Sequence, residues 1–238
     1  MSTTGTALSD QQRIAALETK LDQVTHQLGM VEDAQQIRSL QHIYGFYLDK
    51  CLYNEVVDLF ARECEMHFFG GIFRNRAGLV RVYCERFRKN FTGGKNGPVW
   101  GFLLDHPMLQ DIVHVAPDRK TAKARLRCMM MAGRHDLAEG ETRQFWEGAI
   151  YENVYEKEDG IWKIKVLNYR PVWHAYYQTG WAYTKPHWVT FYTPNDLFPK
   201  NPIGPDELED PPPVLWPETD IIPFHYPHPV TGQWVKGD

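Results

Sequence analysis

The sequence predicts an α+β protein in which a curved antiparallel sheet closes over a few helices and leaves an aromatic-lined pocket. Apolar residues follow helical spacing through most of the first 90 residues. Between residues 108 and 170, segments of alternating apolar and polar residues are separated by turn residues, as in a meandering sheet. Helices followed by such strands indicate an α+β arrangement instead of a repeated strand–helix–strand series.

Size and composition are those of one globular domain with a long tail. The 238 residues can form one sizeable core but are few for two full domains. We divide the chain into an N-terminal helix at 1–32, a domain at 33–170 and a C-terminal arm at 171–238. Aromatic residues make up 13% of the chain and supply flat apolar surfaces for a core or for an aromatic ligand.

Charge and apolar runs argue against two classes of partner. The formal net charge of −4 gives no basic footprint for nucleic acid or for an anionic membrane surface. No stretch reaches 18 apolar residues, and the first residues lack the pattern of a signal peptide. The four cysteines have no metal-binding spacing, so we expect reduced thiols and a cytoplasmic protein.

Residues 10–31 carry a heptad repeat of apolar side chains. Its members, spaced alternately by three and four residues, are Ile14, Leu17, Leu21, Val24, Leu28 and Val31. About three heptads are the minimum for a coiled coil. The repeat therefore fits either a contact between subunits or a helix packed on its own domain.

A second helix is predicted to begin at Asp33, because Asp33 and Gln36 have the spacing of a capping box. Its apolar positions run at helical spacing from Ile37 to Leu48. A shorter helix at Asn54–Ala61 follows, with Asn54 as its N-cap.

The helical spacing then gives way to a hairpin and a further helix. Cys64–Phe69 is predicted as a strand, Gly70-Gly71 as its turn and Ile72-Phe73 as the returning strand. A helix around 77–89 should end at the glycine-rich loop Thr92–Gly97.

Four longer strands are predicted in the second half of the chain. They are Met108–Val115, Thr121–Met131, Thr142–Glu156 and Trp162–Arg170, with turns at 116–119, 138–140 and 159–160. In the second strand, Ala122, Leu126 and Met130 alternate with Lys123 and Arg127, so one face should be buried and the other wet.

The arm begins at Pro171. Thirteen of the sixteen prolines lie from this residue on, so little regular structure is expected. Tryptophan and tyrosine are also frequent there, which makes the segment too apolar for a disordered tail. We expect an ordered arm that lies on this domain or on a neighbouring subunit.

The chemistry suggested by the sequence is that of isolated acid–base groups. No phosphate-binding loop, dinucleotide fingerprint, zinc-protease motif or nucleophile elbow is present, and the ten histidines form no metal-ligand pattern. Asp49, at the end of an apolar helix, fits a solvated helix end or a half-buried base. His106, at the start of a strand, fits a satisfied core residue or a general acid–base group, since histidine titrates near pH ~6.5.

Several short motifs occur in a recognisable order. Asp33-x3-Ile37-x2-Leu40-x3-Tyr44-x4-Asp49 precedes Val57-x-Leu59-Phe60 and the run Phe-Phe-Gly-Gly-Ile-Phe-Arg-Asn-Arg. His106 then precedes a strand, and Tyr151-Glu152-Asn153 precedes Asp159-Gly160-x-Trp162-x-Ile164. Over residues 30–170 this order resembles the SnoaL-like branch of the nuclear transport factor 2-like superfamily.

The resemblance implies a cone of curved antiparallel sheet wrapped around N-terminal helices, with a pocket inside. Scytalone dehydratase, ketosteroid isomerases, polyketide cyclases and limonene epoxide hydrolase resemble this fold and mostly act without a metal or organic cofactor, so none is expected here. Asp49 and His106 match the positions of the dehydratase's pocket aspartate and histidine. Leu48 stands where the dehydratase has a tyrosine, and its second pocket histidine has no counterpart near Gly148–Tyr151.

The long aromatic arm resembles that of extended bacterial members, which include lignin diarylpropane and phenylcoumaran lyases that release formaldehyde. This resemblance implies a cofactor-free lyase that acts on a phenolic, lignin-derived diaryl molecule. Asp49 is the candidate base, His106 the candidate acid and Tyr44 a candidate partner of a developing phenolate. Further residues expected at the substrate are Tyr47, Arg74, Arg76, Phe145, Tyr151 and Asn168.

Two other functions fit the same resemblance. The β subunits of aromatic-ring dioxygenases resemble this fold and serve assembly, a role that the heptad repeat would suit. A dehydratase, isomerase or cyclase of a polycyclic substrate is the other. We expect a homo-oligomer, either dimer or trimer, with a small aromatic substrate and without a nucleic-acid or membrane partner.

Overall fold

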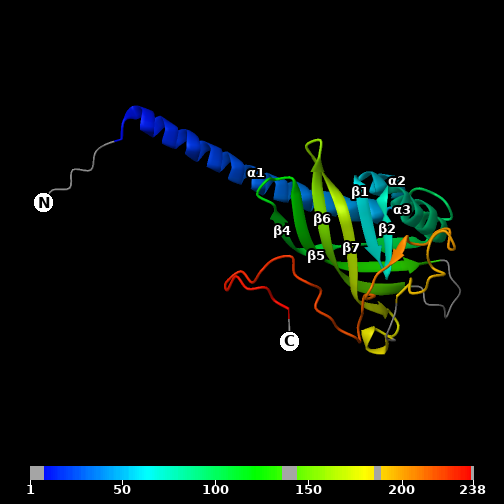
Figure 1. The fold of residues 1–238 in the computed structure, drawn as a ribbon. Coiled ribbons are helices and arrows are strands. Elements are labelled where there is room, and N and C mark those ends of the chain that lie inside the picture. The colour runs from blue at the N-terminus through cyan, green and yellow to red at the C-terminus, as the bar shows by residue number, and fades with distance from the viewer. Residues whose placement is uncertain (1–7, 136–143, 185–188, 237–238) are drawn as a thin grey trace.

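The computed structural model describes residues 8–135, 144–184 and 189–236 and confirms the α+β class (Figure 1). Its helices are α1 (Asp10–Asp49), α2 (Tyr53–Asp58), α3 (Asn75–Leu79), the π-helix η1 (Val80–Phe87), α4 (Arg88–Thr92) and the 3-10 helix η2 (Trp181–Tyr183). Its strands are β1 (Phe60–Phe68), β2 (Gly71–Arg74), β3 (Phe102–Asp105), β4 (Met108–Val115), β5 (Thr121–Arg134), β6 (Gln144–Glu158), β7 (Ile161–Tyr176) and β8 (Glu207–Leu208).

The strands form one curved sheet in the order β3-β5-β6-β7-β1-β2-β8, and β4 also pairs with β5. All pairings between the described strands are antiparallel except that of β1 with β7, which is parallel. The C-terminal half of α1 lies along the sheet, where it contacts β3, β4 and β7, while its N-terminal half extends away from the body (Figure 1). The sheet and the helices thus enclose the core between them.

The N-terminal helix is continuous, and the predicted helix start at Asp33 is wrong. α1 begins after Ser9, whose side chain forms a capping box with Gln12. Asp33 is buried within the helix, and its carboxylate accepts hydrogen bonds from Arg119, Lys157 and Trp162. A capping residue and a buried ion-pair residue can have the same sequence spacing, because both types of site select a carboxylate.

Several predicted boundaries of the following elements change. α2 begins at Tyr53, and the side-chain oxygen of Asn54 accepts a hydrogen bond from Arg88 instead of capping the helix. The hairpin turn is Phe69-Gly70, where both residues have positive φ (46° and 89°), as two-residue hairpins require. The predicted helix at 77–89 extends from Asn75 to Thr92, and left-handed Gly93 ends it as expected.

The second half is the predicted series of strands with two additions. β3 was not predicted, and β7 continues to Tyr176, beyond the predicted end at Arg170. The turn predicted at 138–140 lies outside the described residues, as do the first two residues of the strand predicted at Thr142–Glu156. The alternation in β5 is confirmed, because Ala122, Leu126 and Met130 are buried whereas Lys123 and Arg127 are exposed.

Parts of the C-terminal arm contact the domain, whereas residues 227–236 are exposed. β8 pairs with β2 at the edge of the sheet, and the side chains of Phe191 and Leu215 are buried in the core. Farther along, the Arg125 guanidinium donates hydrogen bonds to the carbonyl oxygens of Ile222 and Pro223. Within the described part of the chain, no helix is long and apolar enough to cross a membrane.

Candidate active site

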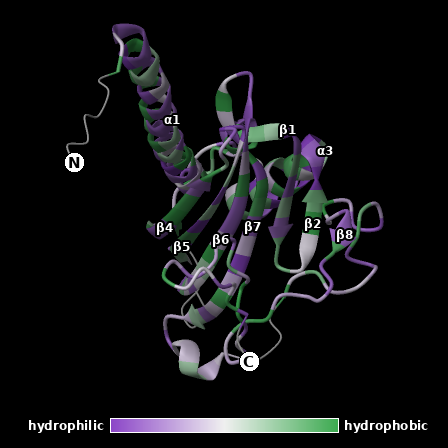
Figure 2. Cartoon of the chain, turned by 60° about the vertical axis from the view of Figure 1, so that its left-hand side comes forward, coloured by the Kyte–Doolittle hydropathy of each residue, from purple (hydrophilic) through white to green (hydrophobic). Residues whose placement is uncertain are grey.

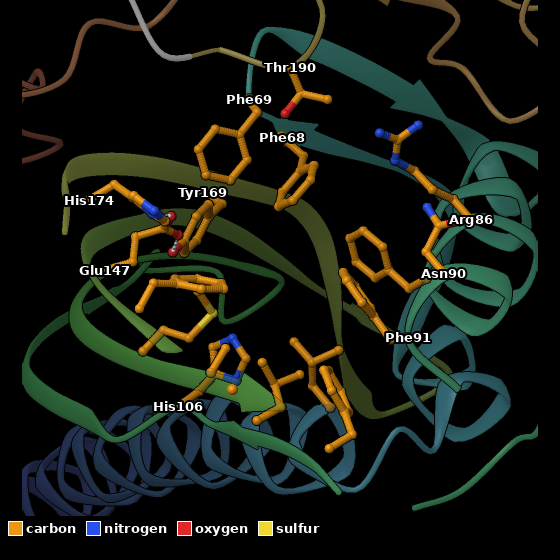
Figure 3. A pocket seen from close by; sticks show the side chains of 18 of the residues that line it. Phe68, Phe69, Arg86, Asn90, Phe91, His106, Glu147, Tyr169, His174 and Thr190 are labelled. Atoms are coloured by element: carbon orange, nitrogen blue, oxygen red, sulfur yellow. Dashed lines mark hydrogen bonds and ion pairs between the residues drawn. The ribbon is translucent and has the colours of Figure 1, made fainter. Parts of the chain in front are cut away.

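A cavity of about 600 Å³ lies between the concave face of the sheet and the helices (Figure 3). Its walls are mainly aromatic and include Phe68, Phe69, Phe87, Phe91, Phe102 and Tyr169. Pockets of roughly 300–1,000 Å³ with apolar walls and a few polar groups are typical of small-molecule sites. The sequence prediction of an aromatic-lined pocket thus corresponds to a cavity of suitable size.

Asp49 and His106 meet at the wall of this cavity. Asp49 is the last residue of α1, and His106 lies between β3 and β4. The Oδ1 atom of Asp49 is 2.7 Å from Nδ1 of His106, and both side chains are at most 10% exposed. An ionised carboxylate can only accept here, so Nδ1 of His106 carries a proton. His106 lines the cavity, while Asp49 lies behind it, so the imidazole is the group available to a ligand.

Three tyrosines form a buried cluster beside this pair. The hydroxyl oxygens of Tyr44 and Tyr83 share a hydrogen bond of 2.9 Å, and the Tyr44 ring packs edge-on against Tyr151. Tyr44 and Tyr151 both line the cavity. Burial raises the pKa of each of the three phenols above its ordinary value. These hydroxyls therefore stay protonated near neutral pH and can act as hydrogen-bond donors rather than as bases.

A second polar group in the cavity was missed by the sequence analysis (Figure 3). The buried carboxylate of Glu147 on β6 accepts a hydrogen bond from the Tyr169 hydroxyl and lies 3.2 Å from Nδ1 of His174, both on β7. Glu147 shares the alternation of buried Ala149, Tyr151 and Asn153, which could have revealed it. His174 lies beyond the predicted end of its strand, so no pattern placed it.

Four of the predicted substrate residues do not line this cavity. Arg74 is ion-paired with Glu65 and Glu207, and Arg76 with Asp58, all on the outer surface. Charged side chains keep their hydration there, which explains why neither arginine turns inward. Tyr47 packs against the core, and Asn168 contacts the buried Asn153 through its backbone. Phe145 does line the cavity and packs against His174.

Within the described residues, the acid–base groups at the cavity form two pairs, Asp49 with His106 and Glu147 with His174. In this part of the chain, no three His, Cys, Asp or Glu side chains are grouped so that they could hold a metal ion. The arrangement of a carboxylate-oriented imidazole in an apolar cavity suits proton transfer to and from a small organic ligand.

Comparison with solved structures shows which fold this is. LinA shares 15% sequence identity with this chain at a TM-score of 0.52, covering 69% of this chain and 99% of its own. A hexachlorocyclohexane dehydrochlorinase LinA-type3 from Novosphingobium barchaimii LL02 shares 17% identity at a TM-score of 0.51, with the same coverage of 69% and 99%. A proposed scytalone dehydratase from Novosphingobium aromaticivorans DSM 12444 shares 18% identity at a TM-score of 0.50, covering 63% and 90%.

Sequence comparison identifies the family. A search among curated proteins found no match. The family model of the SnoaL-like domain matches residues 29–168, which is more than half of the chain and includes Asp49, His106 and Glu147. This chain therefore belongs to the SnoaL-like domain family, within the nuclear transport factor 2-like fold.

Proposed function

We propose that this protein is a cofactor-independent lyase that acts on a phenolic, lignin-derived diaryl molecule by acid–base elimination of water and formaldehyde. The observation that carries the proposal is the Asp49–His106 pair in the wall of an aromatic cavity. Flat rings on several sides favour an aromatic ligand, because stacked and edge-on ring contacts add to the apolar area that is buried.

In this proposal His106 performs the proton transfers and Asp49 positions it. The resemblance implied that Asp49 is the base, but its carboxylate lies behind the imidazole instead of lining the cavity. The Nδ1–H of His106 is held by Asp49, so Nε2 is the atom that exchanges a proton with a ligand. The carboxylate also stabilises the imidazolium form, as an orienting acid does in other acid–base pairs.

The reaction can proceed in two balanced steps. First, the phenol loses its proton to solvent and the benzylic C–O bond breaks, while imidazolium His106 gives its proton to the leaving hydroxide. The products are water and a quinone methide. Second, neutral His106 takes the proton of the terminal hydroxyl and the C–C bond to that carbon breaks. Its electron pair forms the new C=C bond and restores the aromatic ring, which releases formaldehyde and leaves a stilbene phenolate that regains from solvent the proton lost in the first step.

The neighbouring groups support such a sequence. The protonated hydroxyl of Tyr44 or Tyr151 can donate to a developing oxyanion. The carboxylate of Glu147 can accept from a substrate hydroxyl on the other side of the cavity. The low polarity of the surrounding rings strengthens each of these interactions.

Replacement of His106 tests this function. We expect His106→Ala to lower kcat about 10²–10⁴-fold, since this is the usual contribution of a general acid–base group. Formaldehyde release and stilbene absorbance would be measured with phenolic diaryl propanediols. The control is His42→Ala, which removes an exposed imidazole from α1. Near-normal turnover by a folded His106→Ala protein would contradict the proposal.

The same assay separates the other functions that the fold suggests. A dehydratase, isomerase or cyclase would consume its substrate without formaldehyde. An assembly subunit would show no turnover as the purified single chain. Turnover with formaldehyde by this chain alone is the result that only the proposed lyase predicts.

A further inference from the structure

We infer that Arg86 and Asn90 form a subsite that binds an anionic oxygen group carried by an aromatic ring of the ligand. Arg86 is in η1 and Asn90 in α4, four residues apart on one continuous helical wall, so both face the same way. Both line the cavity. The inference rests on the proposed function, because it names the kind of ligand that this cavity takes.

The guanidinium of Arg86 is a cation without a counter-charge in direct contact. Within the described residues it makes no hydrogen bond or ion pair, and it lies over the Phe191 ring at 4.7 Å. The carboxylate of Asp196 attracts it electrostatically, but Asp196 accepts hydrogen bonds from Thr193 and from the Tyr192 backbone. Burial lowers the pKa of Arg86, as expected for a cation that is partly removed from water.

Other arginines on the same helical wall have partners. Arg81 is ion-paired with Asp206, and Arg88 donates to Asn54. A half-buried guanidinium that faces a cavity without such a partner can still gain a charge-assisted hydrogen bond from a ligand. Its fork of donors matches the two oxygens of a carboxylate and can also hold a phenolate.

The subsite lies across the cavity from Glu147 and His174. Figure 3 shows Arg86 and Asn90 on the helical side, with Glu147 and His174 on the opposite side. The rings of Phe68, Phe69 and Phe91 lie between the two polar ends. This arrangement fits an elongated aromatic ligand that is anionic at one end and carries a hydroxyl group for the Glu147 carboxylate at the other.

Binding of shape-matched probes to the full chain tests the subsite without any need for turnover. Dissociation constants for biphenyl-4-carboxylate and biphenyl-4-carboxamide would be measured by calorimetry at pH 7. We expect the wild type to prefer the carboxylate about tenfold or more, the size of a charge-assisted hydrogen bond. Arg86→Gln should abolish the preference, and the control Lys89→Gln, which removes an exposed charge one residue before Asn90, should retain it.

A second probe distinguishes a phenolate from a carboxylate. If the subsite favours phenolate, the absorbance of bound 4-phenylphenol should titrate at lower pH than that of the free phenol, and Arg86→Gln should reverse this shift. Equal affinities of the wild type for acid and amide together with an unshifted phenol, or preferences that survive in Arg86→Gln, would overturn the inference. Because the probes do not react, these outcomes are independent of the His106 assay.

We also propose that copies of this chain join through a parallel coiled coil formed by residues 14–31. The heptad side chains are 56–68% exposed, so they are not packed on their own domain. The projecting part of α1 has bands of hydrophobic residues among its hydrophilic ones (Figure 2). These exposed heptad side chains, here called the seam, fit a second copy of the same helix.

The geometry of α1 leaves the seam accessible to that copy. The buried stripe that holds the helix to its domain includes Asp33, Ile37, Tyr44 and Leu48. At about 100° per residue, this stripe lies roughly 180° around the helix from the seam of 14–31. Each domain would therefore lie outside the helical bundle and would not obstruct it.

The charges beside the seam favour parallel chains. If Ile14 and Leu17 are heptad positions a and d, Arg13 and Lys20 are g positions, and Glu18 and Glu32 are e positions. In a parallel pair, each g residue faces the e residue of the next heptad of its partner, which places Arg13 near Glu18 of the second copy. In an antiparallel pair, e would face e and bring glutamates together.

The seam layers favour more than two strands. Two of its three heptads have leucine at a and valine at d, namely Leu21 with Val24 and Leu28 with Val31. Leucine at a with a β-branched residue at d shifts coiled coils from dimers to trimers or tetramers.

Single cysteines test this assembly in the full chain carrying Cys84→Ser, which removes the one native thiol that is not buried. We expect Leu17→Cys, at the seam, to form an inter-chain disulfide under mild oxidation. The control Thr19→Cys, on the outer face of the helix, should not. Light scattering of the wild type should give at least three times the chain mass of 27.8 kDa. A monomer mass, or cross-linking that is absent or equal in both variants, would overturn the proposal, and a dimer mass would overturn the strand number.

Discussion

The surroundings of Asp49 became clear only from the structure. From the sequence, a carboxylate at the end of an apolar helix fits a solvated terminus as well as a base. In the structure its side chain is nearly enclosed and bonded to His106, which lies 57 residues further along the chain. A carboxylate that is bonded to Nδ1 can fix the orientation and tautomer of an imidazole.

The substitution Asp49→Asn tests this positioning role. The amide has the same shape but can donate to Nδ1, which would move the imidazole proton to the atom that faces the ligand. We expect kcat to fall about 10²–10⁴-fold, as for other acid–base pairs that lose the orienting acid. The dissociation constant of an unreactive aromatic probe should change less than about threefold. A kcat close to that of the wild type, or an equal loss of probe binding, would contradict the assignment.

Glu147 could have been recognised from the sequence, whereas His174 could not. It occupies an inward position of β6, and a carboxylate among buried neighbours is a recognisable sign of a site. His174 carried no such sign, because its strand runs through Pro171 and past the point where the alternation was followed. Proline at a strand position usually argues against strand continuation, so the ordinary rule fails here.

At the level of elements, the two halves of α1 differ in what surrounds them. Its first half carries the exposed heptad seam, and its second half is held to the sheet by a buried stripe. Asp33 lies where the two halves meet and binds groups from two turns of the sheet: Arg119 after β4, and Lys157 with Trp162 around the β6–β7 turn. This cluster fixes the direction in which the helix leaves the domain.

The cluster predicts how stability depends on pH. Burial tends to raise the pKa of Asp33, but the hydrogen bonds from Arg119, Lys157 and Trp162 outweigh burial and lower it to about 2. A carboxyl whose pKa is lower in the folded state stabilises the fold above its unfolded pKa near ~3.9, and this contribution is lost as the pH falls towards ~2. Its size is on the order of 2 kcal/mol.

We therefore expect Asp33→Asn to lower the free energy of unfolding at pH 7 by about 2–4 kcal/mol, since it leaves the partly buried cations of Arg119 and Lys157 without their partner. The difference in free energy of unfolding between variant and wild type should be smaller at pH 3 than at pH 7. Urea unfolding at both pH values measures this, with Asp22→Asn on the exposed part of α1 as control. A gap of constant size would contradict the ion-pair explanation.

On the scale of the whole molecule, the C-terminal arm contributes to the domain that it covers. It adds β8 to the sheet, and Phe191 packs on Phe73 and beneath the guanidinium of Arg86. The proline content predicted little regular structure, and in the described residues only η2 and β8 follow β7. The aromatic side chain of Phe191 is buried, which stabilises the arm on the domain because apolar side chains gain free energy when they leave water.

Much of the architecture could be read from the sequence, since it depends on local spacing. Helical and alternating periods gave the α+β class, the hairpin and most strands, and the order of motifs pointed to the SnoaL-like family. Predicted element boundaries were wrong where a distant partner changed the role of a residue, as at Asp33. They were also wrong where a strand continued through proline, as in β7.

The sequence by itself determined the periodicity of the elements and the heptad repeat, and it singled out Asp49 and His106 as candidate acid–base residues. Only the tertiary structure decided that these two residues form a pair, that Glu147 and His174 join the cavity, and that Arg74 and Arg76 stay outside it. The physical reason is that periodicity follows from backbone geometry over a few residues. The partner of a charged side chain depends on which distant segments the fold brings within hydrogen-bonding distance, and on how much water remains between them.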